Sequence, residues 1–165
     1  MATHRNGYSG LQIGLHWLVM VMVVIQIVIG ENMTEMVEAI EEGEAVSAGD
    51  AFWGSVHFWL GLGILAAMAF RLAVRLRTGV PAHAPGSSPL QNLAASVLHW
   101  AFYVVLLSVP ISGLVAYYGL ADVGEIHGLS KPLLIVLVAI HAGAALYNQF
   151  VRKDGTLTRM LRPQA

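Results

Sequence analysis

Hydrophobic positions along this chain gather into long blocks separated by short polar stretches. Four blocks are almost entirely apolar, and they cover residues 11–30, 53–74, 93–118 and 126–151. A helix needs about 20 mostly apolar residues to cross the hydrocarbon core of a bilayer. The pattern therefore predicts an all-α integral membrane protein in which four spans form one bundle, with residues 1–165 as a single domain.

Composition supports this interpretation and narrows it. The 165 residues are 56% hydrophobic and only 12% charged, which is too apolar for a water-soluble domain and makes membrane lipid the main surroundings. The chain contains no cysteine. Disulfides, iron–sulfur clusters, thiolate metal sites and covalently attached c-type haem are therefore excluded. Nothing in the pattern points to nucleic acid as a partner.

Charges are strongly segregated along the sequence. Eight of the nine Lys and Arg residues lie before the first block, at the end of the second, or after the fourth. The polar segment after the first block has no Lys or Arg and carries seven acids, namely Glu31, Glu35, Glu38, Glu41, Glu42, Glu44 and Asp50. By the positive-inside rule, both termini lie in the cytoplasm and the acidic segment lies outside. Lys131, on the outer side, is the exception.

The acidic segment has a helical pattern of its own. Met33, Met36, Val37 and Ile40 recur at helical spacing among the acids. This spacing fits a short amphipathic helix lying on the outer surface. We favour the simpler interpretation, a solvated acidic helix that only closes the hairpin between the first two spans.

Prolines predict two further irregularities. Pro110 and Gly113 should kink the third span about midway. Pro132 follows Lys131 near the start of the fourth span, so we expect this start to be irregular.

Five histidines fall inside the predicted spans. They are His16, His57, His99, His127 and His141. An ionisable side chain inside a membrane is costly, and it usually marks a functional site. An interhelical hydrogen bond explains a single such histidine equally well, but five together favour a cofactor.

His127 and His141 lie fourteen positions apart on the fourth span. At about 100° and about 1.5 Å per residue, they share one helix face to within about 40° and differ in depth by about 21 Å. Zinc gathers several ligands around one point, whereas a b-type haem takes one histidine from each of two facing helices and needs no cysteine. The spacing therefore predicts two haem b groups at two depths.

Depth along the spans predicts the partner of each of these histidines. His57 lies about five residues inside the outer end of the second span, at the level of His127. His141 lies roughly 16 Å from the cytoplasmic end, where His99 matches it slightly better than His16 does. Spacing alone leaves both His16 and His99 as partners of His141.

Several stretches together resemble one family of membrane cytochromes. They are YSGLQIGLHW at 8–17, His57 with RLAVR at 71–75, LHWAFYVVLLSVPISGLV at 98–115, the His127–His141 spacing, and RKDGTLTRML at 152–161. The chain resembles the bacterial cytochrome b561 family of four-helix, di-haem proteins of the inner membrane, and within it the superoxide oxidase type. The segment ADVGEIHGLSKP departs from that type in being short.

The resemblance implies an enzyme that oxidises superoxide to O2 outside the cell membrane and reduces ubiquinone within it. It also implies that His16 pairs with His141 and that His57 pairs with His127. His99 then lies beside the inner haem or the quinone.

Five further residues are candidates for the site. Arg71 and Arg75 would bind propionates of the inner haem, or they only anchor the helix at the interface. Ser9 and Trp17 are candidates for contact with the quinone headgroup, although Trp17 also fits an interfacial belt position. Lys131 would steer superoxide toward the outer haem or neutralise a propionate.

A second function is a cytochrome b anchor and electron relay for a separate periplasmic dehydrogenase, such as a hydrogenase or a formate dehydrogenase. Such a subunit needs a docking surface, and the acidic segment 31–50 is the candidate for this periplasmic redox partner. A transporter or structural bundle without haem is a third class, which a colourless purified protein would establish.

Overall fold

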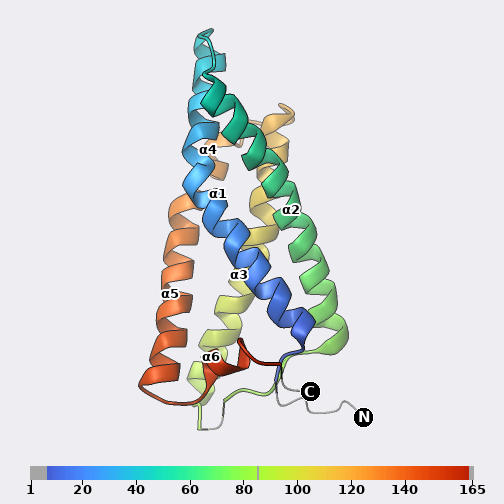
Figure 1. The fold of residues 1–165 in the computed structure, drawn as a ribbon, viewed down its shortest axis with the longest axis vertical. Coiled ribbons are helices and arrows are strands. Elements are labelled where there is room, and N and C mark those ends of the chain that lie inside the picture. The colour runs from blue at the N-terminus through green and yellow to red at the C-terminus, as the bar shows by residue number, and fades with distance from the viewer. Residues whose placement is uncertain (1–6, 85, 164–165) are drawn as a thin grey trace.

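The computed structural model describes residues 7–84 and 86–163, and within these ranges the protein is all-α (Figure 1). Four segments are long and apolar enough to cross a membrane. They are α1 (Gly10–Glu42), α2 (Ala48–Thr78), α3 (Pro89–Tyr117) and the pair formed by α4 (Gly124–Gly128) and α5 (Ser130–Phe150). A short helix, α6 (Thr156–Arg159), follows. The prediction of an all-α membrane protein with four spans is confirmed.

α1 is much longer than the first apolar block. It begins after Ser9, which forms a reciprocal capping box with Gln12, and it ends at Gly43, which adopts a left-handed conformation with φ 72°. Its 33 residues make about 50 Å of helix, whereas the hydrocarbon core is about 30 Å thick. The segment after residue 30 is therefore not a separate amphipathic helix on the membrane surface. It is an acidic helix that closes the hairpin, as favoured, but it is the continuation of α1 out of the membrane.

The outer parts of α1 and α2 form a hairpin that rises beyond the other helices (Figure 1). Asn32 on α1 donates a hydrogen bond to Asp50 on α2 at 2.9 Å. Met33 and Met36 pack on Gly54, where an added Cβ would lie 2.8 Å from Met36 Sδ. These methionines therefore form the apolar seam between α1 and α2 and do not lie on the membrane surface.

α4 and α5 together form the fourth span, with a break between them. Leu129 separates the two helices, and Pro132 lies in the first turn of α5. A proline has no N–H to donate to the preceding turn, so the helix is interrupted there. The irregular start predicted for the fourth span is confirmed, and His127 belongs to the short α4 while His141 belongs to α5. α3, by contrast, continues through Pro110.

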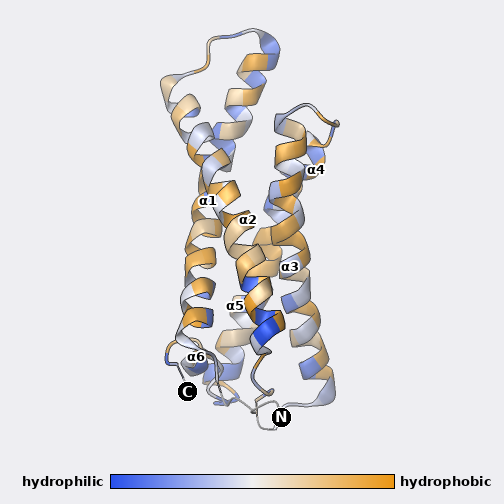
Figure 2. Cartoon of the chain, turned by 90° about the vertical axis from the view of Figure 1, so that its right-hand side faces the viewer, coloured by the Kyte–Doolittle hydropathy of each residue, from blue (hydrophilic) through white to orange (hydrophobic). Residues whose placement is uncertain are grey.

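A layer of buried apolar side chains fills the middle of the bundle. Its members are Val19, Val23, Ile64, Met68, Tyr103, Leu106 and Leu134. Leu134 lies midway in sequence between His127 and His141, so the layer separates two levels of histidines. Within the described ranges no polar or charged residue is fully buried. Hydrophobic residues dominate the middle of the helices (Figure 2). Many large apolar side chains are exposed, and Phe150, for example, is 68% exposed, as expected for a helix that faces lipid.

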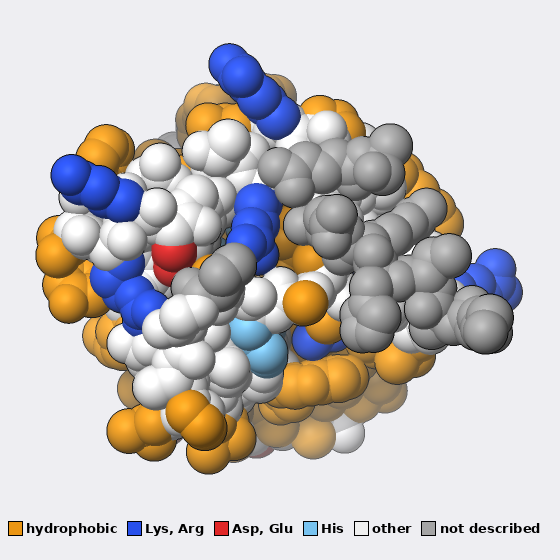
Figure 3. Space-filling model, turned by 90° about the horizontal axis from the view of Figure 1, so that it is seen from below, with side chains coloured by type: hydrophobic (Ala, Val, Ile, Leu, Met, Phe, Trp, Pro, Cys, Tyr) orange, Lys and Arg blue, Asp and Glu red, His pale blue; other side chains and the backbone are white. Residues whose placement is uncertain are grey.

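The two ends of the bundle differ in charge. We call the α1–α2 hairpin beyond residue 30, together with residues 118–131, the acidic end. Among the described residues of this end, Lys131 is the only Lys or Arg. We call the opposite end, where α2 ends and α1 and α3 begin, the basic end. Figure 3 looks onto the basic end and shows Lys and Arg side chains spread around it.

The C-terminal segment folds back across the basic end (Figure 1). Trp17 Nε1 donates to the carbonyl of Met160 at 2.8 Å, which ties this segment to α1. Arg159 donates to the carbonyl of Ala82 at 3.2 Å, which ties it to the loop between α2 and α3. The helices are thus held together at this end by contacts from outside the bundle.

Candidate functional site: two groups of histidines

The five histidines of the spans gather into two groups at two levels. His57 on α2 and His127 on α4 face each other near the acidic end, with ring centroids 6.1 Å apart and an interplanar angle of 74°. His16 on α1, His99 on α3 and His141 on α5 lie together near the basic end. The predicted facing of His57 and His127 is therefore present in the structure.

The ring of His127 is fixed by the backbone of α3. Its Nδ1 lies 3.0 Å from the carbonyl oxygen of Val109 and 3.3 Å from the hydroxyl of Ser112. A carbonyl oxygen only accepts, so Nδ1 carries the proton and donates it to Val109. In a neutral imidazole this leaves Nε2 with a lone pair, which is the state that binds a metal.

Gly113 makes room for this ring. An added Cβ at position 113 would lie 2.8 Å from Cε1 and 3.1 Å from Nδ1 of His127, distances that real Cβ atoms do not reach without displacing a neighbour. From the sequence, Gly113 was expected, together with Pro110, to kink the third span. The structure assigns it a second role, because only a residue without a side chain lets α4 bring its imidazole onto α3.

The basic-end group holds one ring more than a pair requires. The centroids of His16 and His141 are 6.1 Å apart, and those of His99 and His141 are 5.5 Å apart. Phe102 also contacts His141, at 5.4 Å between centroids. Both histidines that depth left open therefore touch His141, and only the first distance equals that of the acidic-end pair.

Arg71 lies against this group. Its Nη2 is 3.0 Å from Nδ1 of His16. A guanidinium only donates, so Nδ1 of His16 accepts here. Arg75 lies over the rings of Trp100 and Tyr103, 5.3 Å and 5.5 Å from their centroids, in cation–π contact.

Tyr8 is a residue of the basic end that the sequence patterns did not single out. Burial raises the pKa of its phenol above the ordinary value, against the opposing effect of Arg75, Arg71 and Arg159. The phenol therefore stays protonated at neutral pH and is available as a hydrogen-bond donor. No periodicity or spacing signals it, since it lies just before α1.

The remaining candidates have protein partners. Ser9 accepts from the N–H of Gln12 in its capping box, and the indole of Trp17 donates to Met160. Lys131 forms an ion pair with Glu31 at 2.8 Å, and the two side chains are 44% and 66% exposed. Lys131 therefore joins the start of α5 to α1.

The donor sets fit haem better than a bare metal ion. Within the ranges that the structure describes, no three His, Cys, Asp or Glu side chains are arranged to hold an ion. An imidazole nitrogen binds a metal at about 2 Å, and its ring centroid is about 1 Å further, so two rings on opposite sides of one metal have centroids about 6 Å apart. Both pairs at 6.1 Å meet this requirement, which suits a metal that brings its other four ligands with it.

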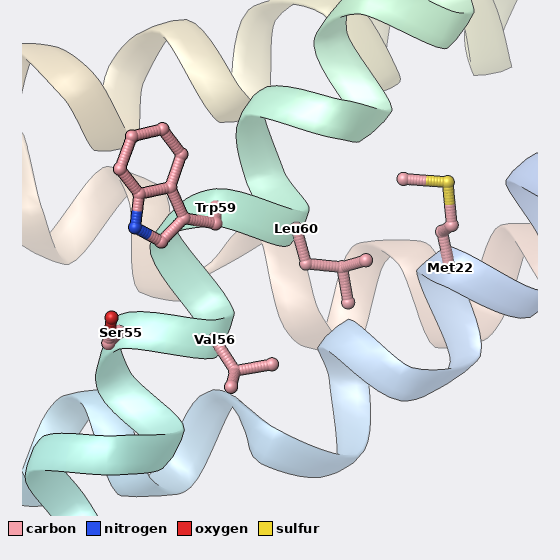
Figure 4. A pocket seen from close by; sticks show the side chains of 5 residues that line it. All are labelled: Met22, Ser55, Val56, Trp59 and Leu60. Atoms are coloured by element: carbon pink, nitrogen blue, oxygen red, sulfur yellow. The ribbon is translucent and has the colours of Figure 1, made fainter.

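A shallow groove on the outer surface is a separate feature. It lies between α1 and α2 and is lined by Met22, Ser55, Val56, Trp59 and Leu60 (Figure 4). It contains no histidine, and Trp59 is 67% exposed. Its open and apolar lining is that of a lipid-facing surface.

Four membrane-crossing helices with facing histidines define a membrane cytochrome b, a protein that carries electrons across a bilayer. In agreement, the model of the prokaryotic cytochrome b561 family matches residues 7–163, and the chain belongs to this family. Family membership implies haem of the b type and transmembrane electron transfer.

Curated relatives cover nearly the whole chain. The chain is 33% identical to cytochrome b562 of Cereibacter sphaeroides, over 98% of this chain and 99% of that protein. It is 31% identical to the probable superoxide oxidase CybB of Yersinia pestis, over 93% of this chain and 95% of that protein. It is 28% identical to cytochrome b561 homolog 1 of Escherichia coli K12, over 94% and 97%.

Proposed function

We propose that this protein is a di-haem superoxide oxidase of the bacterial inner membrane, with both termini in the cytoplasm. His57 and His127 hold one haem near the periplasm, and His16 and His141 hold the other near the cytoplasm. Each superoxide loses one electron and leaves as O2. Two such electrons and two protons from the cytoplasm convert one ubiquinone to ubiquinol.

Bound haem supplies the one-electron chemistry, and the chain supplies the rest. The Val109 carbonyl holds the proton on Nδ1 of His127 and so presents Nε2 to iron. Lys131 is the positive charge that attracts an anion to this end, since it lies four residues after His127 and is half-exposed. The buried apolar layer around Leu106 and Leu134 excludes water between the two levels.

At the basic end the chain prepares a charged and hydrogen-bonding environment. Arg71, already within reach of His16, is placed to bind a haem propionate. Tyr8, with its raised pKa, supplies a neutral donor for a quinone carbonyl. Ser9 and Trp17 stay candidates for contact with the headgroup, and Trp17 is 36% exposed.

One observation carries the proposal. Two pairs of imidazoles, each with its centroids 6.1 Å apart, lie on either side of one dry layer. Relatedness to a probable superoxide oxidase supports the choice of donor. The test uses the purified chain without any partner. We expect a reduced-minus-oxidised spectrum of low-spin b haem with two haems per chain, and reduction by superoxide followed by reduction of a ubiquinone analogue.

A specific feature favours the second function, an electron relay for a periplasmic redox protein. Glu31, Glu35, Glu38 and Glu42 recur at helical spacing and form one exposed stripe along the outer part of α1. Such a stripe repels superoxide and attracts a positively charged protein. A purified di-haem chain that superoxide does not reduce would establish the relay and overturn the oxidase.

A further inference from the structure

Two buried polar atoms lack a hydrogen-bond partner in the described part of the chain, and both lie where α1 crosses α2. They are Oε1 of Gln26 and Nδ1 of His57. The other end of the same amide, Gln26 Nε2, donates to the backbone carbonyl of His57 at 2.9 Å. Gln26 is therefore already bonded to the residue whose ring nitrogen is unpaired.

Two glycines bring the two side chains into this position. Gly61 lies one turn after His57 on α2, and a Cβ there would lie 3.5 Å from Gln26 Nε2. Gly30 lies one turn after Gln26 on α1, and a Cβ there would lie 3.8 Å from Cε1 and 4.0 Å from Nδ1 of His57. The Nδ1 edge of the imidazole thus faces α1 within one turn of Gln26.

The two unpaired atoms are complementary. A histidine that offers Nε2 to iron carries its proton on Nδ1 and needs an acceptor there. The amide oxygen of glutamine is an acceptor and needs a donor. A buried polar atom without a hydrogen-bond partner is unfavourable. A hydrogen bond between Nδ1 of His57 and Oε1 of Gln26 would therefore stabilise the protein by satisfying both atoms at once.

We infer that Gln26 is the positioning residue of the haem ligand His57, with its Oε1 accepting the Nδ1 proton. This inference rests on the proposed function, because it requires a haem on His57. The two ligands of that haem are then held alike, since the carbonyl of Val109 accepts from Nδ1 of His127. Gln26 fixes the ring orientation and makes Nε2 a stronger electron donor, which favours the ferric state and lowers the midpoint potential.

The experiment replaces the amide and reads the haem directly. Gln26→Met keeps the length of the side chain and removes both hydrogen bonds. We expect it to raise the midpoint potential of the acidic-end haem, to change the g values of its ferric EPR signal, and to weaken haem retention about tenfold or more. The basic-end haem should keep its potential.

Gln26→Glu is the rescue variant. A neutral carboxyl offers a hydroxyl to the His57 carbonyl and an oxygen to Nδ1, and an ionised one is a stronger acceptor still. Its potential should therefore lie at or below that of the unmodified protein, on the opposite side from Gln26→Met. Gln149→Met, which removes an acceptor of the Leu157 N–H near the basic end, is the matched control and should leave the acidic-end potential unchanged.

Two results would overturn the inference. One is an acidic-end haem whose potential and EPR signal are unchanged in both Gln26 variants, and the other is Gln26→Glu with a raised potential. Should Gln26→Met not fold, the second criterion still decides. His57→Ala separates this inference from the proposed function: if it keeps both haems, the ligand assignment fails, whereas if it loses one while the Gln26 variants change nothing, only the role of Gln26 fails.

Discussion

The acidic-end pair and the basic-end group hold histidines in opposite ways. At the acidic end, His127 donates from Nδ1 to a backbone carbonyl, and its neighbour Gly113 leaves the space that the ring occupies. At the basic end, Nδ1 of His16 accepts from the side chain of Arg71. Two rings meet at the first site and three at the second.

This difference indicates which site must rearrange to bind haem. We call the acidic-end pair the preset site, because His127 already has its Nδ1 proton held by a backbone carbonyl, whereas the basic-end group must rearrange. The Val109 carbonyl belongs to the backbone of α3, so in the proposal His127 would present Nε2 to iron without rearranging. His16 presents Nε2 only if its proton moves to Nδ1 and Arg71 turns to another acceptor. The proposed propionate contact of Arg71 supplies that acceptor, so in the proposal the ligand role of His16 and the anion role of Arg71 depend on each other.

The largest expected effect is the loss of one haem from the preset site. His127→Ala and His57→Ala should each remove or convert the acidic-end haem and largely spare the other, because the two sites lie on opposite sides of the buried layer. Haem per chain and the visible spectrum measure this. A chain without His127 that kept two normal low-spin haems would refute the assignment.

The second prediction concerns the three-ring group. His16→Ala should abolish the basic-end haem, whereas His99→Ala should retain it with a shifted spectrum, because only His16 and His141 have the 6.1 Å spacing of the other pair. The same two measurements decide it. If His99→Ala loses the haem and His16→Ala keeps it, His99 is the ligand, in agreement with its slightly better match to His141 in depth.

A smaller effect is expected from crowding the preset ring. Gly113→Ala places a Cβ 2.8 Å from His127 Cε1, and overpacking of this kind costs about 1–3 kcal/mol. We expect a lower acidic-end haem content and a lower midpoint of thermal unfolding. Gly124→Ala, in the short helix α4 that carries His127 and with open space around it, is the control, and equal losses in both variants would argue against a specific role for Gly113.

The smallest expected effect concerns the rate at which an anion reaches the acidic end. Glu31 neutralises Lys131 in the ion pair, so Glu31→Gln should speed haem reduction by superoxide about two- to fivefold, and Lys131→Glu should slow it by a similar factor. Stopped-flow rates at low and high salt test this, and both effects should shrink as salt increases. Reduction by a neutral hydroquinone should stay constant, and rates indifferent to both changes would remove the steering role.

The fold was largely predictable because the apolar blocks and the helices cover the same residues through most of the chain. The two differ after Gly30, where the apolar block ends but the helix continues. Residues 31–42 are mostly good helix formers, and the first strong stop signal is Gly43. Reading the end of the apolar block as the end of the helix caused the one wrong element.

The site was predictable only in part. Sequence spacing gives the relative positions of two residues on one helix, but the relative positions of residues on different helices depend on how those helices pack. Fourteen positions put His127 and His141 at two levels, and depth brought His57 to His127. The contact between Arg71 and His16 depends on how α1 crosses α2, and that crossing leaves no periodic trace in the sequence. The acceptor of His127 could not be predicted, since a backbone carbonyl has no sequence signature.

The dry layer between the two histidine levels has an electrical consequence. Apart from Tyr103, whose ring lies under Arg75 at the basic end, its side chains, Leu106 and Leu134 among them, carry no group that would pass a proton. An electron that crosses these apolar side chains moves alone and carries its charge through part of the membrane voltage. Moving one electron across the whole membrane costs or releases about 2.3 kcal/mol for each 100 mV of membrane voltage, depending on the direction. For an electron travelling from the periplasm to the cytoplasm against an interior-negative voltage, the cost must be met by the difference in potential between donor and quinone. An interior-negative membrane voltage would therefore slow electron transfer from the periplasm to the quinone, and dissipating the voltage would speed it.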